Sequence, residues 1–430
     1  MRNREIVLGG WIKLLLTAVS LLLLIVFYLV LSGCTMLLMT DDFSYSSIVK
    51  TDKLLLIVKD ELYSSLEYSI DQYVQDLDEE GCSVSIFIWQ NGTAYDLKNI
   101  LNAYYTDDNI GGALLVGDLP SVWYEMYSFN RYEEFPCDLF FMDFNAAWED
   151  TDNDEILDYH SALNLEIFIS RIKGTSEELC RYFEKVHRYR MDEFEVEKIA
   201  YIFKDNDWAD FNKGSSFQLN DIYDSIEICE APDETEKSNY ISKLTGYGAE
   251  FVYQWIHAYP PLLCIEGNES FSYIHTSEIE MDNLEGLFYN LFNCSASRFT
   301  ENNIGMTYLM KTDYGLATMG STKVGGNYYP KVFHGTLSRN HTWGDAYMAW
   351  YNNYGVTDDE WFMGMVILGD PMLVVTKEVP RVLKKEPMTV IPPGVEEIED
   401  LNNIFQNFMK DYWEGSFEEY KNSNPQFFED

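Results

Sequence analysis

Short apolar segments alternate with amphipathic segments along most of this chain, and this alternation restricts the fold more than any other feature. The apolar segments are rich in β-branched and aromatic residues and are expected to be strands: Leu54–Val58, Val84–Trp89, Ala113–Val116, Glu166–Ile172, Ile199–Phe203, Phe251–Ile256, Leu287–Asn293 and Leu316–Met319. The amphipathic segments are expected to be helices: Leu62–Leu77, Leu97–Tyr105, Glu177–Met191, Glu234–Leu244, Ile304–Thr312 and Ala346–Tyr354. Such alternation builds βαβ units, so the pattern predicts an α/β fold with a mostly parallel sheet and helices on both faces.

The spacing of these segments indicates two similar halves. We expect an N-terminal α/β subdomain over residues 53–195 and a C-terminal α/β subdomain over residues 196–376, which would carry the chemistry. Periodicity alone leaves open whether they are two subdomains or one continuous sheet. Residues 377–430 begin with several prolines and are acidic and aromatic, which is typical of an appended tail.

The N-terminus has the pattern of an export signal. Basic residues precede an apolar run, which ends in Leu31-Ser32-Gly33-Cys34. This ending resembles the bacterial lipoprotein box, which implies a signal peptide over residues 1–33, lipidation of Cys34 and a linker over residues 34–52. The chain would then lie at the bacterial cell surface or in the periplasm, held to the membrane by its lipid. The alternative is an uncleaved anchor helix, since the run is long enough to span a bilayer.

The chain is strongly acidic, with 71 Asp and Glu against 30 Lys and Arg and a net charge of −41. Such a charge repels phosphate, so nucleic acid is not an expected partner. Acidity fits calcium binding or cationic protein and peptide substrates, with a merely solvated acidic surface as the alternative. Seven scattered cysteines without a CxxC pair exclude a disulfide scaffold and a zinc site, and leave room for one or two bridges.

Two consecutive predicted strands end on residues that are typical of thiol catalysis. His257 follows the strand Phe251–Ile256, and Cys294 follows the strand Leu287–Asn293. Functional groups of open parallel sheets lie just beyond the carboxyl ends of strands, so we expect the imidazole and thiol side by side. Cys294 would be the nucleophile and His257 the base, with the backbone N–H groups of Ala258 and Ser295 as oxyanion donors. The alternative is a core cysteine and a hydrogen-bonded polar histidine.

Several ordered segments between Leu114 and Leu373 resemble the gingipain-type cysteine peptidases, which have the caspase-like (caspase–hemoglobinase) fold. The segments are Leu114–Pro120, Asp138–Phe141, Glu166–Arg171, Asn290–Ser295, Gly315–Thr322 and Leu368–Pro371. The resemblance implies a catalytic dyad of Cys294 and His257 and no organic cofactor. One departure is Ile256-His257-Ala258, where the family often has Gly-His-Gly. Cys264 and His275 are rival positions for the dyad.

Two acidic segments are candidate binding sites. Asp150, Asp152, Asp154 and Asp158 have the spacing of a calcium loop, although the glycine and distal glutamate of an EF-hand are absent. A solvated acidic turn is the alternative, and the resemblance favours structural Ca²⁺. Asp207 and Asp210 follow the strand Ile199–Phe203. The resemblance implies that an acid in this region selects a basic side chain at P1, the residue before the scissile bond.

Together these features predict an exported cysteine endopeptidase that hydrolyses peptide bonds, with a possible preference for basic P1 residues. The alternative function is a surface binding or adhesion lipoprotein that keeps the caspase-like fold with weak or no catalysis.

Overall fold

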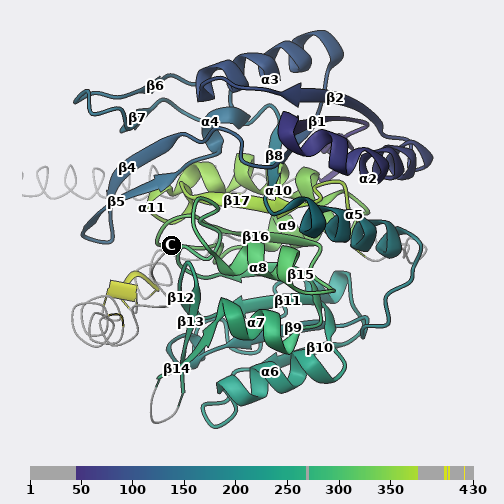
Figure 1. Cartoon of the computed structure of the whole chain (residues 1–430). Coiled ribbons are helices and arrows are strands. Elements are labelled where there is room, and N and C mark those ends of the chain that lie inside the picture. Colours follow the sequence, from purple (N-terminus) through teal and green to yellow (C-terminus); the bar gives the residue numbers. More distant parts are fainter. Residues whose placement is uncertain (1–44, 268–270, 376–400, 404, 407–420, 422–430) are drawn as a thin grey trace, which may run out of the picture. The chain divides into compact units, whose positions relative to one another are not determined.

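A computed structural model of the chain describes residues 45–267, 271–375, 401–403, 405, 406 and 421. Its centre is a ten-stranded sheet with the order β10-β9-β11-β15-β16-β17-β8-β3-β1-β2 (Figure 1). The expected signal peptide, Cys34, the start of the linker and most of the acidic tail lie outside the described residues. Among the described residues, no helix is both long and apolar enough to cross a membrane.

The strands of the large sheet are β1 (Lys53–Lys59), β2 (Ser83–Trp89), β3 (Gly112–Val116), β8 (Phe168–Ile172), β9 (Ala200–Lys204), β10 (Ile226–Cys229), β11 (Ala249–Trp255), β15 (Gly286–Phe292), β16 (Ala317–Ser321) and β17 (Met365–Gly369). The helices are α2 (Asp60–Glu79), α3 (Ala94–Asp108), α4 (Leu139–Met142), α5 (Ser176–Arg190), α6 (Lys237–Gly246), α7 (Thr276–Asp282), α8 (Ile304–Lys311), α9 (Lys331–Leu337), α10 (Trp343–Asn353) and α11 (Asp359–Phe362). Three small sheets are β4–β5 (Trp123–Ser128, Arg131–Pro136), β6–β7 (Trp148–Glu149, Tyr159–His160) and β12–β13–β14 (His257–Tyr259, Leu262–Glu266, Phe271–His275).

The predicted α/β class with a mostly parallel sheet is confirmed. Neighbouring strands from β10 to β16 run parallel, and so do those from β17 to β2, whereas β16 and β17 are antiparallel. The sheet therefore reverses direction once, between its two halves. It is also one continuous sheet, because β17 comes from the C-terminal range yet pairs with β8 from the N-terminal range.

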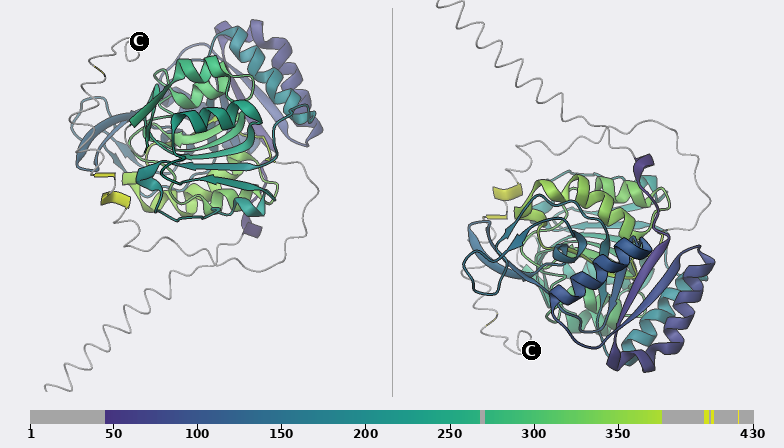
Figure 2. Two further views of the ribbon diagram at one scale, coloured as in Figure 1. Left: turned by 90° about the horizontal axis from the view of Figure 1, so that it is seen from below. Right: turned by 90° about the horizontal axis from the view of Figure 1, so that it is seen from above.

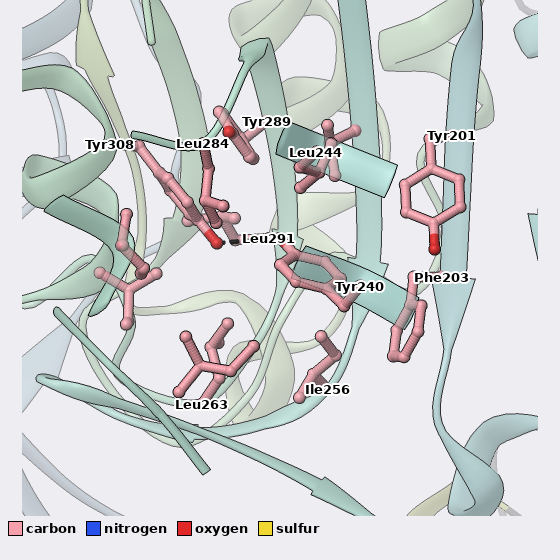
Figure 3. Close-up of a cluster of buried hydrophobic side chains, with 14 of the residues drawn as sticks. Tyr201, Phe203, Tyr240, Leu244, Ile256, Leu263, Leu284, Tyr289, Leu291 and Tyr308 are labelled. Atoms are coloured by element: carbon pink, nitrogen blue, oxygen red, sulfur yellow. Dashed lines mark hydrogen bonds between the residues drawn. The ribbon is translucent and has the colours of Figure 1, made fainter. Parts of the chain in front are cut away.

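Helices cover both faces of the sheet (Figure 2), and the side chains of β15 show how each face is filled. Tyr289 stacks on Tyr308 of α8, with ring centroids 3.9 Å apart. The next side chain back, Phe288, points the other way and lies 5.5 Å from Trp343 of α10. Successive residues of a strand point to opposite faces, so the sheet has an α8 face and an α10 face. Figure 3 shows the α8 face, where Tyr240 of α6 joins this aromatic cluster.

A buried ion pair explains three of the segments on which the family resemblance rests. Arg171 of β8 donates from Nε and Nη2 to the two carboxylate oxygens of Asp138, at 2.7 and 2.8 Å. Its remaining N–H groups bond the carbonyls of Leu119 and Pro120. The guanidinium also lies 4.5 Å from the ring of Phe299, in the loop after Cys294. One arginine thus joins the turn after β3, the segment before α4 and the Cys294 loop.

The six described cysteines are all free, so no disulfide bridge forms among them. The one or two bridges that the cysteine count allowed are therefore not formed among these six residues. Cys82, Cys137 and Cys264 are buried, as small core residues are expected to be.

We predict that Asp138→Ala destabilises the fold by about 3–5 kcal/mol, because it leaves the Arg171 guanidinium buried without its carboxylate. Urea denaturation followed by fluorescence measures the free energy of unfolding. The control is Asp118→Ala, since the Asp118–Lys173 pair is largely exposed and is expected to contribute less than about 1 kcal/mol. Equal losses in the two variants would contradict a structural role of the buried pair.

Candidate active site

One edge of the large sheet collects three of the residues that the sequence singled out, Asp207, His257 and Cys294. Strands β9, β11, β15 and β16 run parallel, so their carboxyl ends meet at the same edge. Asp207 follows β9, His257 follows β11, Cys294 follows β15 and Lys323 follows β16. This is the edge at which open α/β sheets place functional groups.

The paired strands β11 and β15 end at the same edge of the sheet, shortly before His257 and Cys294. The register matches Phe251 with Phe288 and Trp255 with Phe292, and the last two rings lie 4.1 Å apart. His257 and Cys294 each come two residues later, and His257 already belongs to β12, where it lies opposite Cys264 of β13. The Ile256 N–H still bonds the Phe292 carbonyl at 3.4 Å, which continues the pairing past the strand ends. His257 and Cys294 therefore follow strands that end at one edge of the sheet, as predicted.

His257 is held by a carboxylate and an aromatic ring. Its Nε2 lies 2.8 Å from Oδ2 of Asp207, and its ring centroid lies 5.0 Å from that of Trp208. Only 1% of His257 is exposed. Burial lowers the pKa of His257 below 6.5, although the bond and charge of Asp207 oppose this effect. The imidazole is therefore neutral at pH 7, and an ionised Asp207 fixes its proton on Nε2.

Two further carboxyl groups surround Asp207. Burial raises the pKa of Asp207, but hydrogen bonds with His257 and Glu266 outweigh it and hold this pKa below 3.8. Burial and the bond to Asp207 raise the pKa of Glu266 to about 8. Burial, followed by the charges of Asp207 and Glu266, raises the pKa of Asp205 well above 3.8. Asp207 is thus the ionised member of the cluster at neutral pH.

Cys294 lies in a closed environment and is a neutral thiol at pH 7. Only 7% of the residue is exposed, and burial raises the pKa of its thiol to about 12. A hydrogen bond from the backbone N–H of Gly325 acts in the opposite direction. The charge of Glu133 raises this thiol pKa further, whereas those of Lys323 and Arg131 lower it.

One of the two expected oxyanion donors, the Ser295 N–H, is engaged within the protein. The Ser295 N–H donates to the carbonyl of Lys323 at 2.8 Å, so it does not face a substrate carbonyl, and the expected role of Ser295 is corrected on this point. Ala258 lies in the β12–β13 ladder opposite Leu263, and it is buried.

The two acids expected to bind substrate have different surroundings. Asp207 contacts His257 and Glu266, as described above. The side chain of Asp210 is 99% exposed and lies 3.7 Å from Lys213 on the next turn of chain. The structure therefore brings Asp207, but not Asp210, to the histidine.

The two rival positions for the dyad, Cys264 and His275, have different surroundings. Cys264 is buried in β13 directly opposite His257 in the β12–β13 ladder. His275 begins α7, where its backbone N–H donates to Glu278 in a capping arrangement. His275 thus has a structural role at a helix end, while Cys264 has to be controlled for in any thiol experiment.

Several residues of this edge were missed in the sequence. Trp208 touches both strand ends, since its ring lies 5.0 Å from His257 and 5.1 Å from Phe292. Lys323 and Gly325 follow β16, and Glu266 ends β13. The strand-end rule that selected His257 and Cys294 applies equally to Lys323 after the predicted strand Leu316–Met319. Glu266 has no such signal, because β13 was not predicted.

The acidic loop brings its four aspartates together, away from the Cys294 edge. Carboxylate oxygens of Asp150, Asp152 and Asp154 lie within 4.8 Å of one another, as do those of Glu125, Asp152 and Asp158. Carboxylates are the ligands that Ca²⁺ prefers, so the donor set fits this ion. Burial and the charges of Asp154, Asp158 and Asp150 raise the pKa of Asp152. Glu125, from the β4–β5 hairpin, was not foreseen.

Comparison of the sequence with protein-family models and with curated proteins finds no match.

We predict that Ca²⁺ raises the melting temperature by a few degrees and that a chelator reverses the change, because an ion bound only by the folded state stabilises it. Differential scanning fluorimetry measures the shift. Asp152→Asn removes the acid common to both groups and is expected to abolish the response, whereas the exposed Asp233→Asn keeps it. A wild-type melting temperature that ignores both Ca²⁺ and chelator would contradict the calcium site.

Proposed function

We propose that this chain is an exported cysteine endopeptidase of the gingipain type, with the caspase-like variant of the α/β fold. The observation that supports the proposal is that His257 and Cys294 each stand two residues after the paired strand ends Trp255 and Phe292. Export and lipid anchoring through Cys34 belong to the same proposal and rest on the sequence of the N-terminus.

The hydrogen bond to Asp207 decides which atom of His257 acts. Its Nε2 is bonded to the carboxylate, so Nδ1 is the atom that takes the proton from the Cys294 thiol. The sulfur then attacks the substrate carbonyl carbon to give a tetrahedral oxyanion. The C–N bond breaks as the imidazolium returns the proton to the leaving amine, and water hydrolyses the thioester with His257 again as base.

Both members of the pair are neutral at pH 7, so the thiol has to lose its proton during the reaction. The pKa of His257 is lowered and that of Cys294 is raised to about 12. Proton transfer from sulfur to Nδ1 is therefore expected to accompany attack rather than precede it. In this scheme Asp207 orients the imidazole and stabilises its positive charge, as a third group does in a hydrolase triad.

We also propose a preference for basic P1 residues. Asp207 is occupied by His257, so it serves better as a positioning residue than as a substrate ligand. Asp210 is free of the site, and the net charge of −41 favours cationic peptides in general.

A second candidate function, a surface binding protein with weak or no catalysis, is favoured by one observation. The reacting groups are almost fully buried, and the Ser295 N–H is bonded inside the protein. A site in this state has to open before a peptide reaches the sulfur.

We predict that a peptidyl chloromethyl ketone ending in Arg or Lys labels the wild-type protein on Cys294, because the thiol is the nucleophile. Mass spectrometry of the digested protein locates the adduct. Cys294→Ala is expected to abolish labelling, and Cys264→Ala to leave it unchanged. Absence of labelling, or its persistence in Cys294→Ala, would reject the peptidase and favour the binding protein.

We also predict that Asp207→Asn lowers kcat by roughly a hundredfold to ten-thousandfold on all cleaved substrates alike, because it removes the carboxylate that orients His257. A panel of substrates ending in Arg, Lys or Asp, with Asp210→Asn as the matched control, measures the ratio of rates. If Asp207→Asn lowered the rate only on substrates ending in Arg or Lys, Asp207 would be a substrate-binding residue instead.

A further inference from the structure

The two edges of the ten-stranded sheet are protected to different extents. At one end of the strand order, β10 is only four residues long and carries the exposed Glu227, and both features keep an edge from pairing with another chain. At the other end, β2 has seven residues, with neither a charge nor a proline among them. Among the described residues, no strand pairs with the outer side of β2. This edge is therefore open to a further strand.

The uncharged surface extends beyond β2 itself. No Asp, Glu, Lys or Arg occurs between Glu80 and Asp96, although 23% of the chain is charged. Ile88 is 39% exposed, and Val84 and Ile86 are half-buried, whereas the neighbouring strand β1 is buried at all but its two end residues. Two copies of a chain with a net charge of −41 repel each other over most of their surfaces. An uncharged edge is where a second copy can approach.

The hydrogen bonds of β2 show which of its backbone groups point outwards. The Ser83 N–H donates to the carbonyl of Asp52, just before β1, at 2.8 Å. Because backbone groups point alternately to the two sides of a strand, Ser83 and every second residue after it bond β1. The N–H and C=O groups of Val84, Ile86 and Ile88 therefore point out of the sheet.

This strand is complementary to itself in the antiparallel direction. A two-fold axis through Ile86 places this residue opposite its own counterpart, and Val84 opposite Ile88 of the second copy. All the outward backbone groups then find partners, in about six hydrogen bonds. The three side chains are aliphatic and β-branched, which suits cross-strand contact, and no like charges meet. They lie on the face opposite Phe87, whose ring centroid is 6.4 Å from that of Tyr104 in α3.

We propose that β2 is a contact between two copies of this chain, which pair antiparallel about Ile86 and join their sheets into one. Each copy uses the same strand, so the pairing closes on itself and leaves neither β2 edge open. Strands β16, β17, β8, β3 and β1 lie between β15 and β2, which separates the contact from the candidate active site. The proposal therefore does not depend on the peptidase function.

Cysteine cross-linking of the full-length protein tests the contact and its register. Ile86→Cys is expected to form a disulfide-linked dimer, because directly opposed residues of this kind have Cα atoms about 5.5 Å apart, within the range of a disulfide. Val84→Cys and Ile88→Cys are each expected to give no linkage alone, but to link to each other when the two proteins are mixed. Non-reducing gels measure the yield under mild oxidation, and mass spectrometry of the digest separates these linkages from those of the native cysteines.

Two controls separate specific pairing from random collision. Tyr68 of α2 is 83% exposed, so a thiol in Tyr68→Cys is more accessible than one at the half-buried Ile86, yet it is expected to cross-link far less. The mixed Val84→Cys and Ile88→Cys proteins are expected to lose their linkage when both also carry Ile86→Lys, because two lysines would meet on the axis. The melting temperature of Ile86→Lys reports whether the fold is kept, and the register test needs no lysine variant.

Salt distinguishes this contact from one driven by opposite charges. The cross-linking yield of Ile86→Cys is expected to rise severalfold between roughly 50 and 500 mM NaCl, because screening weakens the repulsion between two acidic copies. Equal yields for Ile86→Cys and Tyr68→Cys, linkage of Val84→Cys to itself, or a yield that falls with salt would overturn the proposal. Absence of any linkage through β2 would reject pairing of the chain with itself.

Discussion

The parallel pairing of β11 with β15 is the constraint on which the candidate site depends. Because the two strands run in the same direction and in fixed register, they end together at Trp255 and Phe292, and the chain leaves both of them at one edge. The same rule brings Asp207 from β9 and Lys323 from β16. Reversal of the sheet at β17 then returns the chain to this edge, where Glu360 and Trp361 lie just before that strand.

Burial of His257 and Cys294 determines their protonation state. The low exposure of His257 and Cys294 favours the uncharged form of each, so the resting site is not an ion pair. The charged groups are the neighbours instead. Asp207 bonds the imidazole, so its negative charge lies where positive charge would develop on His257. The site is therefore arranged for charge that forms during proton transfer.

Most strands of the large sheet could be predicted from periodicity, because strands such as β3 are buried at every position and their apolar runs are unbroken. The central strand β17 was missed, although it is equally apolar and buried. Short elements were missed. The edge strand β10 has only four residues, and the hairpin strands β4 and β5 carry charged residues within their runs. Strand ends selected His257 and Cys294 without knowledge of contacts. The hydrogen bond between Asp207 and His257 could not be predicted, since the position of Asp207 depends on the turn after β9. The Ser295 assignment failed because the Lys323 carbonyl takes its N–H.

The central claim is that His257 acts on Cys294, and the most direct measurement is the rate of Cys294 alkylation in wild type and in His257→Gln between pH 5 and pH 9. At pH 7 we expect Cys294 of His257→Gln to be alkylated roughly a hundredfold more slowly than in wild type, because the variant lacks the base. Its rate is also expected to rise with pH across the whole range, as the thiolate of a buried, high-pKa thiol does. Coincident profiles in the two proteins would contradict the pair and, with it, the proposed mechanism.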